Sequence, residues 1–385
     1  MYRIAYFIGA GLTKSLQTSG SPVPMMWDFV PTMAHYLQND AILAAMVELE
    51  RADLFEWKSA EAERLAGEEF PPDRAAFKRA LENRPAESIE DLLERSLGPT
   101  ANFSAQGTHQ RFKYAINQLF CMVGWKISWA PLERFLQNQF RKPDTEHTFI
   151  SFNYDLVLDH AVQRCFVDWG PATGYGMEIP FYVTDDLPVT EKHAGPAVSV
   201  PATRFAAAPT SPVRILKPHG SLNWLVPYGT PYEQSPEGLR LLDHPVIIPI
   251  TPEGEIRYWP SSHTFQAITL PRGLPTDIGI CILPPSSAKR SELPFLKLIR
   301  NSEMDTLADA DEVFVIGWSI PETDLDQFSL IKTAVESRSK PLKRITIVNR
   351  GAPTAYFKRL TALFGSDPNS LHVYNAGFTQ FASTL

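Results

Sequence analysis

The sequence predicts an α/β protein with a Rossmann-like parallel sheet and a helical insertion. Several apolar runs are too short for a helix and do not alternate with polar residues, which is typical of parallel strands buried on both faces. Each of these runs ends in a glycine or a small polar cluster. A long segment after the first run instead carries apolar residues at helical spacing. The runs that predict strands are residues 4–8, 148–152, 213–216, 312–316 and 344–348.

The domain organisation follows from where these patterns change. Residues 19–24 are rich in serine, glycine and proline, which predicts a loop after the first strand and its turn. Apolar residues then recur at intervals of three and four, beginning in residues 29–37, and this spacing predicts helices. We therefore expect residues 1–26 and 146–385 to form one Rossmann-like domain, and residues 27–145 to form a helical insertion module.

Composition places the chain among globular proteins and excludes several classes of partner. Of 385 residues, 44% are apolar and 21% are charged, which suits a protein with a substantial core. No apolar tract is long enough to span a bilayer and the chain begins without a signal peptide, so we expect a cytoplasmic protein with no membrane contact. A net charge of −7 opposes association with nucleic acid, and we expect no direct nucleic-acid binding.

The cysteines and histidines predict neither disulfides nor a metal site. Cys121, Cys165 and Cys281 stand far apart, so the chain has no CxxC pair for zinc, and we expect these side chains to be small buried apolar groups. The nine histidines show no HExxH or comparable ligand spacing. We therefore expect no metal, and in particular no zinc.

The turn after the first strand has the outline of a nucleotide-binding turn. Gly9 and Gly11 flank Ala10, so the backbone can turn sharply and a phosphate can approach it, and Thr13 can begin or cap a helix. The dinucleotide fingerprint requires a third glycine where this chain has Lys14, and no second strand ending in an acidic residue follows. An ordinary dehydrogenase domain is therefore disfavoured, and a tight turn without a ligand is the alternative.

Small polar or glycine clusters also follow the other four predicted strands. In chain order they contribute Asn153 and Asp155, His219 and Gly220, Gly317 and Ser319, and Asn349. Because the carboxyl ends of parallel strands meet at one edge, we expect these residues to converge on a single crevice. Two structural alternatives stay open: His219 could be a strand-end histidine with satisfied hydrogen bonds, and residues 153–155 could form a helix cap.

The remaining segments show weaker patterns. Residues 170–212 are rich in proline, alanine and threonine, which predicts a long excursion over the surface. Residues 225–285 are rich in proline and hold only short apolar runs. Helical spacing over residues 288–310 and 354–364, and a last short strand at residues 371–374, complete the expected elements.

Six short motifs together resemble a known family. They are GAG at 9–11 with Thr13, VP at 23–24 ahead of Trp27, SFNYD at 151–155, KPHGSLNW at 217–224, PP at 284–285 and GWSIPETD at 317–324. The sequence resembles the sirtuin-like (silent-information-regulator-type) NAD-hydrolysing domains of bacterial anti-phage defence systems, and is most like a stand-alone subunit partnered with a HerA-type ATPase. The motifs occur in the family's order, whereas the helical insertion and residues 225–285 are not covered.

The resemblance implies a sirtuin-like sheet with NAD lying across the crevice as the substrate. The implied activity is an NAD+ glycohydrolase that releases nicotinamide and ADP-ribose and so depletes NAD during infection. Asn153 would orient the attacking water, His219 would engage the nicotinamide ribose and act as general base, and Asp155 would hold the carboxamide. The other residues implied to bind NAD are Gly9, Ala10, Gly11 and Thr13 at the phosphates, Gly220, and Gly317, Ser319 and Asn349 at the adenosine end.

The chain departs from protein-deacylating sirtuins, which carry a four-cysteine zinc module that this sequence cannot supply. Deacylation is therefore put in doubt. An NAD-dependent deacylase or an ADP-ribosyl transferase stays open as an alternative. A non-catalytic subunit that binds NAD or ADP-ribose within a defence complex stays open as well.

The resemblance also implies regulation by other chains. A free NAD hydrolase would poison its host, and the expected catalytic domain and insertion use almost the whole sequence, which leaves no segment for a sensor domain. We expect a homo-oligomer that joins a HerA-type ATPase or, alternatively, a short Argonaute. Trp125 and Trp129 could form the contact surface for such a partner or could simply belong to the core.

Overall fold

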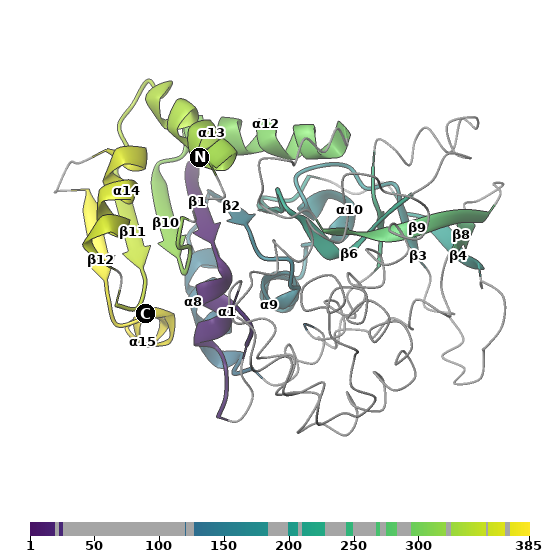
Figure 1. The fold of residues 1–385 in the computed structure, drawn as a ribbon, viewed down its shortest axis with the longest axis horizontal. Helices are drawn as coiled ribbons and strands as arrows, with labels where there is room; N and C mark the ends of the chain where they lie inside the picture. The colour runs from purple at the N-terminus through teal and green to yellow at the C-terminus, as the bar shows by residue number, and fades with distance from the viewer. Residues whose placement is uncertain are drawn as a thin grey trace, which may run out of the picture.

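The computed structural model describes most of the sheet domain. The described residues are 1–19, 23–25, 120, 127–183, 199–206, 210–227, 244–248, 267–269, 275–282, 294–320, 325–351, 353–365 and 370–385. They form a parallel sheet with helices on both faces, beside a small closed barrel (Figure 1).

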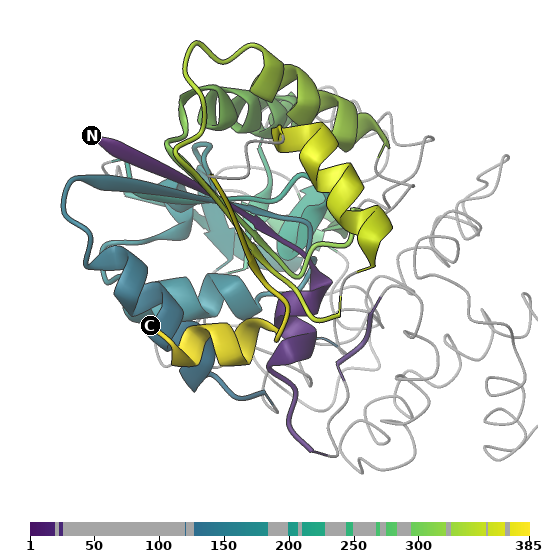
Figure 2. The ribbon, with the colours of Figure 1, turned by 90° about the vertical axis from the view of Figure 1, so that its left-hand side faces the viewer.

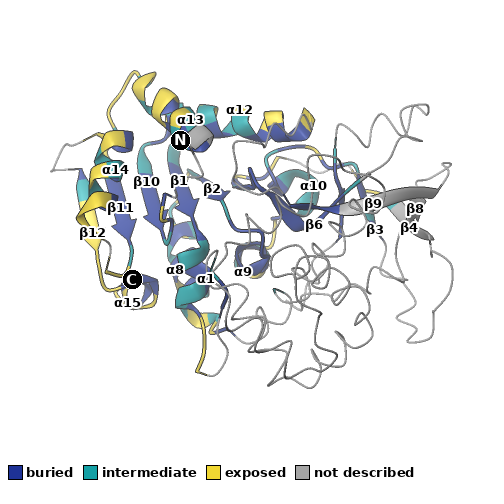
Figure 3. Cartoon of the chain, in the orientation of Figure 1, coloured by how far each residue is buried: buried dark blue, intermediate teal, exposed yellow. Residues whose placement is uncertain are grey.

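A six-stranded sheet organises the domain, and all of its strand pairs are parallel. Its strands are β1 (Tyr2–Ile8), β2 (Thr145–Ser151), β5 (Val213–Leu216), β10 (Glu312–Ile316), β11 (Arg344–Val348) and β12 (Leu371–Tyr374). The five strands predicted from apolar runs all lie in it, which confirms the predicted Rossmann-like α/β class. Their apolar residues are buried, and Figure 3 shows the centre of the sheet as the most buried part of the domain.

The order of the strands is β12-β11-β10-β1-β2-β5. Numbered along the chain within this sheet, the order from the other edge is 3-2-1-4-5-6, which is the order of doubly wound dinucleotide-binding domains. After β1, the chain adds β2 and then β5 on one side, and it then adds β10, β11 and β12 on the other side of β1. The crevice at the carboxyl end of β1, where the order reverses, is the usual ligand position in such a sheet.

Helices cover both faces of the sheet (Figure 2). One face carries α12 (Pro294–Asp309), α13 (Leu325–Glu336) and α14 (Thr354–Phe364). The other carries α1 (Ala10–Ser15), α8 (Ala130–Phe140), α9 (Val157–Cys165) and α15 (Phe378–Ser383). Strands covered on both sides explain why the sequence shows continuous apolar runs without alternation.

The packing of α8 bears on the expected helical insertion. Phe135 of α8 is buried, with its ring centroid 5.9 Å from that of Tyr6 in β1 and 6.0 Å from that of Phe314 in β10. This helix, near the end of the 27–145 segment, is thus part of the layer that covers the sheet. Most of residues 27–145 lie outside the described residues, so the insertion itself stays a prediction.

The barrel was not predicted. It closes in the order β3-β4-β8-β9-β6-β7. Its strands are β3 (Phe181–Val183), β4 (Ser199–Arg204), β6 (Gly220–Pro227), β7 (Val246–Ile247), β8 (Ala267–Thr269) and β9 (Pro275–Ile282). The expectation that residues 170–212 run over the surface was wrong, because they supply α10 (Pro171–Gly174), β3 and β4 and bury Tyr175 completely.

Candidate active site

The predicted site residues all follow the carboxyl ends of strands in the parallel sheet. The glycine turn follows β1, Asn153 and Asp155 follow β2, and His219 and Gly220 follow β5. Gly317 and Ser319 follow β10, and Asn349 follows β11. The sheet therefore brings all five clusters to one edge, as the sequence predicted. Their roles in binding or chemistry stay predictions.

Backbone packing accounts for the glycines of the first turn. The amide of Gly9 donates to the carbonyl of Ile316 at 3.0 Å, and the amide of Gly11 donates to the carbonyl of Gly317 at 2.9 Å. A Cβ built on Gly9 would lie 2.4 Å from Cα of Trp318, and one built on Gly11 would lie 2.8 Å from the Gly317 oxygen. The turn after β1 and the loop after β10 thus touch backbone to backbone, and this contact requires glycine with or without a phosphate.

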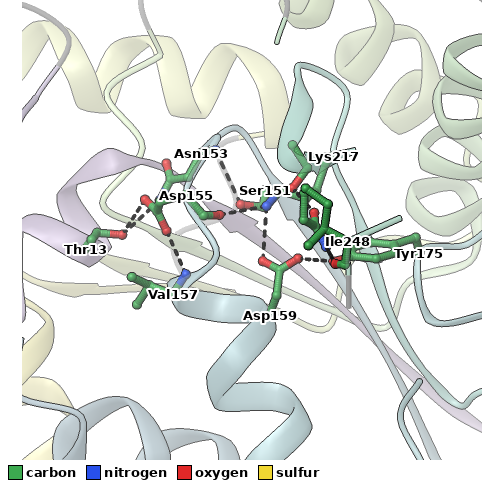
Figure 4. Close-up of polar contacts among 11 residues, drawn as sticks. Thr13, Ser151, Asn153, Asp155, Val157, Asp159, Tyr175, Lys217 and Ile248 are labelled. Atoms are coloured by element: carbon green, nitrogen blue, oxygen red, sulfur yellow. Dashed lines mark hydrogen bonds and ion pairs between the residues drawn. The ribbon is translucent and has the colours of Figure 1, made fainter. Parts of the chain in front are cut away.

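Asn153 and Thr13 join the end of β2 to this turn (Figure 4). Nδ2 of Asn153 donates to the carbonyl of Gly9 at 3.2 Å and to Oγ1 of Thr13 at 3.3 Å. Oγ1 of Thr13 in turn donates to Oδ2 of Asp155 at 3.0 Å. All three side chains are buried, with Asn153 only 7% exposed. These bonds fix the amide of Asn153 in one orientation beside the glycine turn.

Asp155 is a buried carboxyl group with several donors. Its Oδ1 accepts the backbone amide of Val157, the first residue of α9, at 3.0 Å. The N-cap position of α9 is Leu156 and has no side-chain cap, so the structure does not show residues 153–155 as the helix cap that the structural alternative proposed. Burial raises the pKa of Asp155, and the ammonium of Lys217, the Val157 amide and the Thr13 hydroxyl partly offset this rise. These hydrogen bonds are compatible with a role in binding, because only part of the carboxylate's acceptor capacity is used.

A fully buried ion pair lies directly behind these residues, and sequence reasoning missed it. Nζ of Lys217 donates to Oδ2 of Asp159 at 3.1 Å, and neither side chain is exposed. The hydroxyl of Tyr175 donates to Oδ1 of Asp159 at 2.6 Å. Nδ2 of Asn223 donates to that hydroxyl at 3.1 Å and to the carbonyl of Ile248 at 3.3 Å (Figure 4). The pair thus connects the sheet to the barrel.

His219 lies beside the loop after β2. The residue is 7% exposed, and its ring centroid lies 5.5 Å from that of Phe152 and 6.4 Å from that of Tyr154, the two neighbours of Asn153. Gly220 has φ +83, and a Cβ there would lie 2.0 Å from the carbonyl oxygen of Cys281 in β9. The barrel strand β9 therefore explains the glycine at position 220, while His219 is held close to Asn153.

The residues expected at the adenosine end are more open. Ser319 is exposed and Asn349 is half-buried, and Oδ1 of Asn349 accepts the amide of Arg350 at 2.7 Å. The hydrogen bonds of the described residues do not join Ser319 or Asn349 to the network around Asp155. Ile320, beyond Ser319, has φ 52, a conformation that β-branched residues rarely adopt.

In the part of the chain that the structure describes, no group of three or more histidine, cysteine, aspartate or glutamate side chains is placed to hold a metal ion. No helix within the described ranges is both long and apolar enough to cross a membrane.

Comparisons with known proteins add little to this geometry. No family model matches the chain, and no curated protein matches it. A solved structure from work on the structural basis for the mechanism and regulation of Sir2 enzymes aligns with 99% of this chain and 90% of its own, at 11% identity and a TM-score of 0.28. A likeness this weak carries no argument, so the fold class rests on the sheet topology.

Proposed function

We propose that the protein is an NAD+ glycohydrolase that cleaves the bond between nicotinamide and ribose. The observation that carries this proposal is the strand order, which reverses at β1 and brings the glycine turn, Asn153 and His219 to one edge of the sheet, where such sheets bind ligands. The sirtuin-like motifs of the sequence coincide with these positions. They supply the reaction type, which a nucleotide-binding sheet alone does not.

The site suits this cleavage because the reaction requires few catalytic groups. Nicotinamide leaves as a neutral molecule, so no general acid is needed, and the barrier falls mainly by stabilising the cationic sugar and placing a nucleophile. The amide hydrogens of Asn153 are held by Gly9 and Thr13, which turns its Oδ1 into a fixed acceptor for a water O–H. His219, whose ring lies beside that of Phe152, would engage the ribose and accept a proton.

The test is product analysis after incubation with NAD. We expect equimolar free nicotinamide and ADP-ribose, without any acceptor in the mixture. Adding an acylated peptide or a protein acceptor separates the alternatives. Nicotinamide release that requires the acylated peptide would identify a deacylase, and label transferred to protein would identify an ADP-ribosyl transferase. Binding of NAD or ADP-ribose by calorimetry with no product formed would identify a non-catalytic binding subunit.

We further propose that this activity serves anti-phage defence and is controlled by assembly. The support is the sequence resemblance, which implies a homo-oligomer bound to a HerA-type ATPase or, alternatively, to a short Argonaute. Trp125 lies outside the described residues. Trp129 is half-buried, with the guanidinium carbon of Arg164 5.7 Å from its ring centroid. A monomer at all concentrations that cleaves NAD fully on its own would contradict the proposed control by assembly.

A further inference from the structure

Lys217 follows the edge strand β5 and carries an ammonium group with no exposed surface. It donates to the main-chain oxygen of Asp155 at 2.7 Å and to the carboxylate of Asp159 at 3.1 Å (Figure 4). Removing two charges from water is energetically costly, and replacing such a pair by apolar residues is often neutral or stabilising. Stability alone therefore gives a poor reason for a lysine here, and its position must be considered.

The hydrogen bond from Lys217 to the carbonyl of Asp155 joins the two loops of the candidate site. Lys217 precedes His219 by two residues, and Asp155 follows Asn153 by two. The pairing of β2 with β5 ends at Ile150 and Leu216. Beyond it, the backbone amide of Phe152 still donates to the carbonyl of Ile8, and that of Leu222 donates to the carbonyl of Tyr154. Between these two bonds, the Lys217 ammonium joins the main chain of the Asn153 loop, at the carbonyl of Asp155, to the loop that carries His219.

The ammonium is itself held from the barrel side. Asp159, on α9, receives the Tyr175 hydroxyl on its other oxygen, and Asn223 of β6 donates to that hydroxyl. The carboxylate of Asp155 has its own donors in Thr13 and the Val157 amide. The bond from Lys217 to the Asp155 carbonyl thus fixes the backbone, while the bond to Asp159 balances the charge.

We infer that Lys217 is a positioning residue that sets the distance between Asn153 and His219, an inference that rests on the proposed NAD cleavage. Lys217 need not touch NAD. Displacing a catalytic group by about 1 Å can cost on the order of 100-fold in rate. The glycine turn and the residues after β10 and β11 stay in place without Lys217, so NAD binding is expected to survive its loss.

The test compares a charge-balanced double variant with a control. Lys217→Met alone would leave Asp159 as an uncompensated buried charge and could unfold the protein. The double variant Lys217→Met with Asp159→Asn removes both charges and keeps an oxygen for the Tyr175 hydroxyl. The control is Tyr6→Phe, which removes a buried hydroxyl that contacts Gln139 at 3.2 Å and His147 at 2.8 Å, away from both loops.

Steady-state kinetics and melting temperature are measured together. In the double variant we expect kcat to fall at least about 30-fold with KM for NAD within about threefold of wild type. Tyr6→Phe is expected to lose melting temperature but to keep kcat. Unchanged kcat in the folded double variant, or a loss of kcat in Tyr6→Phe that follows its loss of stability, would overturn the inference.

A second measurement separates this inference from the proposed function. If wild type cleaves no NAD under any condition tested, the proposed function fails, and the ring signals of His219 and the side-chain amide signals of Asn153 in nuclear magnetic resonance still report on Lys217. We expect both sets to shift and broaden in the double variant. In Tyr6→Phe the His147 ring, which the Tyr6 hydroxyl contacts, should respond, whereas the His219 and Asn153 signals should not. Unchanged His219 and Asn153 signals in the double variant would refute the positioning role.

Discussion

At the scale of single residues, Gly317 and Gly351 offer a test of the backbone contact behind the site. Their φ values are +61 and +63, so an alanine is strained equally at both, by about 1 kcal/mol. A Cβ on Gly317 would lie 2.3 Å from the amide nitrogen of Leu12, whereas one on Gly351 meets nothing within 4 Å. We expect Gly317→Ala to lose roughly 2 kcal/mol more than Gly351→Ala in urea unfolding. Equal losses would show that the turn and the β10 loop do not touch.

His160 and His147 predict how stability depends on pH. Burial lowers the pKa of each histidine to about 4. For His160, the nearby Asp159 raises the pKa and Arg164 lowers it. For His147, the nearby Lys142 lowers the pKa further. In the unfolded chain both titrate near the ordinary value of 6.5, so the unfolded state binds more protons between pH 6.5 and 4. The stability from these two groups is therefore complete above pH 6.5 and is lost as the pH falls through that window.

His160→Leu isolates one of these two contributions. Both ring nitrogens of His160 are buried and make no hydrogen bond with any described residue, so leucine removes no bond. We expect equal or greater stability at pH 7.5 and a loss between pH 6.5 and 4.5 that is smaller than that of wild type by roughly 2 kcal/mol. Denaturant titrations of both proteins at pH 7.5, 6.5 and 4.5 measure these stabilities. A pH dependence identical to that of wild type would rule out a buried neutral His160.

The residue scale also shows where sequence reasoning stops. Asn153, His219 and the glycines could be found because they follow apolar runs, and the sheet does bring those strand ends together. Lys217 follows such a run too, but a sequence cannot say that an ammonium is buried, since lysine is usually exposed. Its partner Asp159 lies on α9, 58 residues earlier in the chain, and only the folded chain brings the two together.

At the scale of elements, α8 tests whether the expected insertion includes the helix beside β2. Phe135 packs against Tyr6 and Phe314 of the sheet and against Phe378 of α15. We expect Phe135→Ala to lower the stability of the main unfolding transition by about 3–5 kcal/mol. Gln137→Ala, at an exposed position of the same helix, should change it by less than about 0.5 kcal/mol. A separate, early transition in Phe135→Ala with the main one unchanged would place α8 in an independent module.

The barrel illustrates why some elements were missed. Its segment around β3 alternates buried Ile179, Phe181 and Val183 with half-buried Pro180 and Tyr182, which is a strand pattern of period two. Proline nearby masked that signal, and β7 and β8 are only two and three residues long. Strands this short are defined by their neighbours rather than by their own residues.

At the scale of the whole molecule, the order of the strands determines which segments of the chain meet at the candidate site. Buried strands could be recognised from the sequence, but their order could not, because apolar runs do not specify which neighbours pair. The observed order places the reversal at β1, where the glycine turn lies. The parallel sheet thus explains how segments more than 300 residues apart, such as Gly9 and Gly317, come into contact.

The rate of nicotinamide release from NAD by wild type, Asn153→Ala and His219→Ala tests the central claim most directly. Each side chain follows a strand end, and the strand-end backbone hydrogen bonds remain in both variants, so we expect both to fold and to bind ADP-ribose. Loss of a positioned water or of a general base typically costs two or more orders of magnitude in rate. We predict that each variant releases nicotinamide at least about 100-fold more slowly than wild type. Release at the wild-type rate by either variant would contradict the account and move the chemistry away from this edge of the sheet.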